Sequence, residues 1–140
     1  MVDFSQVDPV FPDKTTAAGA RYAYSKEAIV ARGQFALEDL YSRPEKFIVV
    51  VSHSGFLRQG VTGSWFFNAD YRIFDFEGPA SDEGVSNMDG AGGGAKGRKY
   101  KLRQWEDTRA NKGGLGWSFE EEVEIGHGLP EAWTPEAEAD

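Results

Sequence analysis

Residues 47–58 read Phe-Ile-Val-Val-Val-Ser-His-Ser-Gly-Phe-Leu-Arg, and this stretch decides the predicted fold. Phe47 to Val51 is an unbroken apolar run that is rich in β-branched residues and has no polar alternation. Such a run is typical of a strand that is covered on both faces, as a central parallel strand between helices is. Residues 54–61 then predict a short helix.

A longer helix is predicted before this strand. Ser25 fits an N-cap, and Glu27 places a carboxylate at the positive end of the helix dipole. Because glycine costs a helix about 1 kcal/mol relative to alanine, Gly33 on the apolar face predicts a close approach to a neighbouring element. Pro44 ends the helix. The order helix, central strand, helix predicts a three-layer α/β sandwich. The apolar face is formed by Ile29, Gly33, Ala36 and Leu40.

The rest of the chain predicts one domain over residues 1–140, with two further strands. Alternating side chains predict these strands over 71–76 and 100–105. Residues 78–98 are rich in glycine and predict a flexible loop. Residues 131–140 predict a frayed acidic tail.

The composition narrows the class of protein. Of the 140 residues, 15 are Lys or Arg and 23 are Asp or Glu, which gives a formal net charge of −8. This excess repels nucleic acids and anionic membranes, so neither is an expected partner. The absence of cysteine removes disulfides, thiolate nucleophiles and Cys-based zinc sites. The first residues lack the features of a secretory signal, and no apolar run approaches the roughly twenty residues that span a bilayer. We therefore expect a cytoplasmic location.

His53 is the candidate catalytic and phosphate-binding residue. It follows the predicted central strand, and ligands of open α/β sheets bind beyond the carboxyl ends of their strands. Ser54 then opens a helix, whose first N–H groups lack intrahelical acceptors and suit an anion. The imidazole could donate a hydrogen bond to a phosphoryl oxygen at the same point. The alternative is that His53 only ends the strand and bonds a backbone carbonyl.

Other motifs have structural interpretations. Gly92–Gly97 has the spacing of a dinucleotide-binding loop but lacks the preceding apolar strand and the following helix, so it predicts a linker. The cations of Arg98–Arg103 fit a solvated strand face or edge better than a nucleic-acid patch. Glu120–Glu122 predicts an exposed helix face, because no calcium-loop motif surrounds it. His127 lies between glycines and is expected at the surface. No metal and no cofactor is predicted.

Three segments, in this order, resemble the carboxyl-terminal half of the histidine phosphatase superfamily, the phosphoglycerate mutase-like proteins, and in particular its fungal-type branch. The likeness is strongest from about Arg32 to Phe76, and the stretch from Asp8 to Lys14 is similar to what that branch carries upstream. In this family the matching histidine is the second of two active-site histidines. The resemblance therefore implies that His53 would hold the transferring phosphoryl group, helped by the N–H of Ser54, in metal-free phosphomonoester chemistry. The three segments are Arg43-Pro44-Glu45, residues 48–58 and residues 68–74.

One family motif is absent. The nucleophilic histidine of the family lies in an Arg-His-Gly motif, and no arginine of this sequence is followed by histidine. Covalent catalysis needs the attacking atom itself, so we expect this chain to bind phosphate or a phosphorylated small molecule with little or no turnover.

The resemblance also implies a partial sandwich, in which the amino-terminal strand and helices are missing. The strand before His53 would then keep an open edge, and open edges recruit partners or aggregate. The chain would be a truncated product, a domain completed by another chain, or a repacked pseudoenzyme. The alternative function is a non-catalytic interaction protein, which docks a partner or forms an oligomer through that edge.

Overall fold

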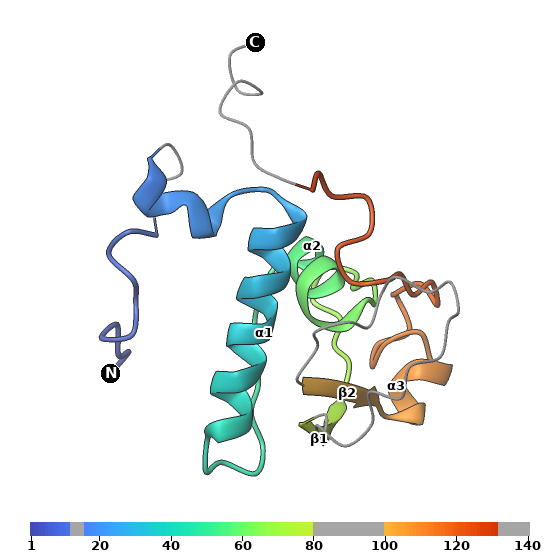
Figure 1. Ribbon diagram of the computed structural model, residues 1–140. Helices are drawn as coiled ribbons and strands as arrows, with labels where there is room; N and C mark the ends of the chain where they lie inside the picture. Colours follow the sequence, from blue (N-terminus) through green and yellow to red (C-terminus); the bar gives the residue numbers. More distant parts are fainter. Residues whose placement is uncertain (12–15, 80–99, 132–140) are drawn as a thin grey trace.

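The computed structural model describes residues 1–11, 16–79 and 100–131, and shows a small mixed α/β domain (Figure 1). A long helix, α1, stands beside a shorter helical stretch, α2 followed by η2, and a two-stranded sheet lies at the end of the domain away from the start of α1. In chain order the elements are η1 (Ala17–Tyr22), α1 (Lys26–Ser42), α2 (Ser54–Phe56), η2 (Leu57–Thr62), β1 (Phe74–Pro79), β2 (Tyr100–Gln104) and α3 (Glu106–Ala110).

The predicted helix before the apolar run is confirmed as α1. Ser25 is its N-cap, and the Ser25 Oγ accepts a hydrogen bond from the Ala28 N–H at 3.2 Å. Ile29, Gly33 and Leu37 are buried along one face. The helix ends at Ser42, where the chain approaches the proline that cannot continue it.

Glycine at position 33 allows the backbones of α1 and η2 to meet. A Cβ on Gly33 would overlap the carbonyl oxygen of Gly60 and lie 3.1 Å from its Cα. Gly60 lies in η2, which has π-helical hydrogen bonding and continues the helical stretch that begins at Ser54. The predicted close approach at Gly33 and the predicted helix over 54–61 are therefore both confirmed.

The sheet consists of β1 and β2 paired antiparallel, with Phe74 opposite Gln104 and Phe76 opposite Leu102. The strand expected over 71–76 starts later and extends further, so Gly78 and Pro79 belong to β1 instead of the predicted loop. The strand expected over 100–105 is confirmed as β2. The rest of that loop and almost all of the predicted acidic tail lie outside the described residues.

The core lies between α1, η2 and the sheet. Leu37 of α1, Val61 of η2 and Tyr100 of β2 are buried together. The described sheet has two strands, so the core is small for a three-layer sandwich. Partly buried residues that pack against it are Phe56, Leu57, Phe76 and Leu102.

The apolar run before His53 is neither buried nor paired, so the predicted central strand is wrong for this chain on its own. Phe47, Ile48, Val49, Val50 and Val51 expose 78, 37, 74, 51 and 92% of their surfaces. No backbone N–H or C=O group of this segment bonds any described residue. The reason is the lack of partners, because β1 and β2 pair only with each other. Figure 1 shows the segment returning alongside α1 to the start of α2.

Two local predictions also differ from the structure. Glu120–Glu122 is exposed as expected, but it forms no helix, and Glu122 makes an isolated bridge to Ser64. The short helix α3 was not predicted from the sequence. Among the helices described, none has the length and apolar character needed to cross a bilayer.

Candidate functional site

His53 is exposed at the point where the apolar segment meets α2. Its backbone is extended (φ −78°, ψ 140°), and its carbonyl oxygen accepts a hydrogen bond from the Leu57 N–H at 3.0 Å. The imidazole forms no hydrogen bond to any described residue, so the alternative in which it bonds a backbone carbonyl is not what the structure shows. The ring is therefore open to solvent and to a ligand.

Ser54, the residue after His53, has a hydroxyl that a backbone hydrogen bond holds in place. Its side-chain oxygen accepts a hydrogen bond from the Phe66 N–H at 3.3 Å, which leaves the hydroxyl proton available as a donor. The N–H groups of Ser54, Gly55 and Phe56 form the first helical turn and have no acceptor within the helix. One imidazole, one hydroxyl and these N–H groups can all donate to an oxyanion.

The helical stretch that carries this site is anchored at its far end. Gly63, with φ +78°, ends η2 in the left-handed region, and its carbonyl accepts a hydrogen bond from the Val123 N–H at 2.8 Å. The Gln59 carbonyl accepts one from the Gly126 N–H at 2.8 Å. Residues 123 and 126 therefore anchor η2 and the residue that ends it.

The arginines on the flanking helices are already engaged. Arg58 forms an ion pair with Glu121 at 3.2 Å. Arg32 donates to the carbonyls of Arg21 and Ala23, at 2.8 and 3.3 Å, and burial lowers its pKa. Phosphate sites commonly use a bidentate arginine. The Arg32 guanidinium is committed to backbone carbonyls, whereas Arg58 pairs with Glu121 through one terminal nitrogen and its buried Nε has no partner among the described residues. The groups at His53 are donors of the kind that an anion site uses, and the second imidazole of the chain, His127, lies in the turn at residues 125–128.

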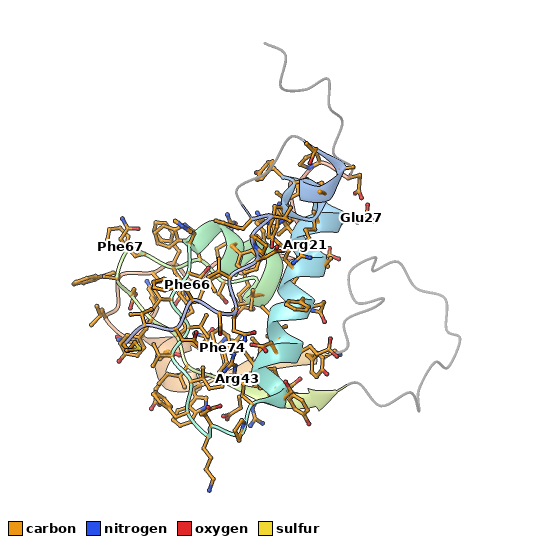
Figure 2. The ribbon with its side chains drawn as sticks, turned by 90° about the vertical axis from the view of Figure 1, so that its left-hand side faces the viewer. Arg21, Glu27, Arg43, Phe66, Phe67 and Phe74 are labelled. Atoms are coloured by element: carbon orange, nitrogen blue, oxygen red, sulfur yellow. The ribbon has the colours of Figure 1, made fainter. Side chains whose placement is uncertain are left out.

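A separate groove of 540 Å³ lies between the last turns of α1 and the apolar segment. Asp39, Leu40 and Arg43 line it on the helix side, and residues 45 and 47–51 line the other side. Figure 2 shows Arg43 at the end of α1 opposite to Arg21 and Glu27. Neither His53 nor Ser54 lines this groove, so the cavity and the candidate phosphate site are different places.

The second histidine, His127, lies at the surface as the sequence predicts. His127 is exposed in a turn at residues 125–128. In the described ranges, no group of three or more His, Cys, Asp or Glu side chains is arranged to hold a metal ion.

Sequence reasoning missed a second polar centre, at Asp70. Its carboxylate accepts hydrogen bonds from the N–H groups of Leu115 at 2.8 Å, Trp117 at 3.2 Å and Ser118 at 3.0 Å, and from the Ser118 hydroxyl at 2.7 Å. Burial alone would raise the pKa of this carboxyl, but these bonds and one from the Tyr71 N–H together lower it. The arrangement ties residues 113–118 to the turn before β1, which is a structural role. The only signal in the sequence is the glycine-rich turn at 113–116.

Comparisons of the chain with protein-family models, with curated proteins and with solved structures found no match.

Proposed function

We propose that this chain is a partial phosphoglycerate mutase-like unit of the histidine phosphatase superfamily, which binds phosphate or a phosphomonoester at His53 and Ser54. The proposed parent fold is the three-layer α/β sandwich, and the described elements would form part of it. The observation that carries the proposal is an exposed imidazole directly before a helical first turn, at the end of an apolar segment. The cytoplasmic location remains a prediction that goes with this assignment.

The chemistry of the site favours binding over turnover. The phosphoryl oxygens would accept hydrogen bonds from the imidazole, the Ser54 hydroxyl and the first N–H groups of α2, which is the kind of anion site that helix starts form. Transfer through a phosphohistidine needs a nucleophilic nitrogen in line with the leaving oxygen. The 140 residues contain two histidines, and His127 lies in an exposed turn. We therefore infer that this sequence binds phosphomonoesters without hydrolysing them at a useful rate.

The test compares His53→Ala with His127→Ala, because the chain offers its second exposed histidine as a matched control. Thermal unfolding is followed with increasing inorganic phosphate, against chloride at equal ionic strength. Phosphate at ten times its dissociation constant should stabilise the wild type by about 1.4 kcal/mol, which corresponds to a rise in Tm of roughly 3–6 °C. His127→Ala should keep this shift and His53→Ala should lose most of it.

The assay also has results that contradict the proposal. Equal phosphate shifts in wild type and His53→Ala would remove His53 from the site. Hydrolysis of an aryl phosphate that depends on His53 would contradict the inference that the chain binds phosphomonoesters without hydrolysing them. It would still support His53 as the phosphate site.

A second candidate function has its own observation in support. The exposed, unpaired segment Phe47–Val51 is suited to an interaction protein that docks a partner by strand addition. This function does not need phosphate binding, because its residues do not include His53 or Ser54.

A further inference from the structure

The exposure of the segment Phe47–Val51 alternates with a period of two residues. Phe47, Val49 and Val51 expose 78, 74 and 92% of their surfaces, whereas Ile48 and Val50 expose 37 and 51%. Successive side chains of an extended strand point to opposite faces. The segment therefore already has the side-chain pattern of a strand, with Ile48 and Val50 on its more covered face.

The backbone of this segment is ready to form a ladder. None of its N–H or C=O groups has a partner in the described part of the chain, and the groove beside it is open. An apolar strand with unpaired backbone groups is a template for another strand. What remains to be identified is the strand that pairs with it.

We propose that the occupant is a second copy of this chain, with the two segments paired antiparallel about a twofold axis at Val49. This inference deepens the second candidate function, rests on it, and does not require phosphate binding at His53. In this register Phe47 lies opposite Val51 and Ile48 opposite Val50, so all five apolar residues face apolar residues. Shifting the register by one residue in either direction places an apolar side chain opposite a polar one, Ser52 in one direction and Lys46 in the other.

The polar residues at the two ends of the segment fit the same register. Glu45 of each copy lies opposite His53 of the other, and Lys46 lies opposite Ser52. Polar cross-strand pairs that hydrogen-bond stabilise a sheet, and a carboxylate can accept a hydrogen bond from an imidazole N–H. A shift of one residue toward Ser52 would instead separate Glu45 from His53. A twofold interface of this kind is self-complementary, as most homodimer interfaces are.

The interface is small, so we expect a dimer that dissociates on dilution in the micromolar range or above. Sedimentation velocity of the full chain over a wide concentration range measures this directly. The central pair gives a specific test, because the twofold axis places residue 49 opposite itself. In Val49→Glu two carboxylates would meet, and the dissociation constant should rise roughly tenfold or more. Val49 is largely exposed, so the substitution should leave the monomer folded.

Two further variants make the test decisive. Phe35→Glu changes an equally exposed apolar residue on α1 and should leave dimerisation unchanged. Val49→Lys should also be monomeric, but mixing it with Val49→Glu should restore a dimer, because opposite charges then meet at the axis. Circular dichroism and thermal unfolding check that each variant is folded.

Several results would overturn this proposal. If the wild type stays monomeric at the highest concentration, a second copy of the chain does not pair with the segment and the proposal is wrong. A dimer that is insensitive to Val49→Glu would place the interface elsewhere. Failure of the two charged variants to associate with each other would exclude the register. None of these results tests whether phosphate binds at His53, because sedimentation is run without phosphate and His53 is intact in every variant.

Discussion

The contact between α1 and η2 gives the sharpest prediction, because two physical effects oppose each other at Gly33. Replacing Gly33 by alanine improves helix propensity by about 1 kcal/mol. The new methyl group would, however, overlap the Gly60 carbonyl oxygen and lie 3.1 Å from the Gly60 Cα. Carbon atoms make their best contacts at roughly 3.5–4.0 Å. No rotamer change relieves this overlap, because the obstacle is backbone.

The steric effect should therefore dominate. Overpacking of a core contact costs about 1–3 kcal/mol, and a rigid backbone obstacle places Gly33→Ala at the upper end of that range. Subtracting the gain in propensity leaves a loss of about 2 kcal/mol, or roughly 4–8 °C in Tm. Urea and thermal unfolding measure this loss. The matched control is Gly55→Ala in α2, where a Cβ meets nothing within 4 Å, so its stability should stay the same or rise. A Gly33→Ala protein as stable as the wild type would show that α1 and η2 do not pack through these glycines.

Two other predictions concern groups with defined hydrogen bonds. Asp70→Asn keeps the size of the side chain but removes the charge that several N–H groups bind, and we expect a loss of about 2 kcal/mol in urea unfolding, moderated by partial solvent exposure. The folded-state pKa of Asp70 is lowered from its usual 3.8. The contribution of this carboxylate to the free energy of unfolding is therefore present above pH 3.8 and is lost as the pH falls through the folded-state pKa. If the acid unfolding of Asp70→Asn were the same as that of the wild type, this prediction would be wrong. Ser25→Ala removes the N-cap bond of α1 and should cost about 1 kcal/mol, whereas Ser25→Gly, which fits the buried site, should cost only a few tenths of a kcal/mol.

The elements that could be predicted from the sequence are those with local causes. The α1 helix follows from an N-cap at Ser25, an apolar face at helical spacing and a proline beyond its end. The close approach at Gly33 could be predicted because glycine destabilises a helix interior, so a glycine on the apolar face indicates that a side chain would not fit there. The start of a helix directly after His53 was predicted as well, but the central strand from which the sequence placed this histidine at a sheet edge is not formed.

The elements that could not be predicted depend on distant partners. Burial of residues 47–51 was inferred from their composition, but a strand is buried only where other strands and helices are available to cover it, and the described chain supplies none. The Asp70 centre joins residues 45 or more positions apart in the sequence. No periodicity within a short window carries that information.

Phosphate binding and dimerisation, the two processes proposed above, should influence each other because both involve His53. Pairing of the segments about Val49 would bring Glu45 of the second copy opposite the imidazole, and a carboxylate there repels an incoming phosphate. Phosphate bound at His53 would in turn occupy the imidazole that Glu45 of the second copy faces in the dimer. Linkage requires the two effects to be equal in free energy, so phosphate should favour the monomer by the same factor by which dimerisation weakens phosphate binding. The helical stretch of α2 and η2 packs closely against α1, whereas the segment before His53 has no backbone hydrogen bonds to described residues. The segment can therefore pair with a second copy, or separate from it, without disturbing the helix that carries Ser54.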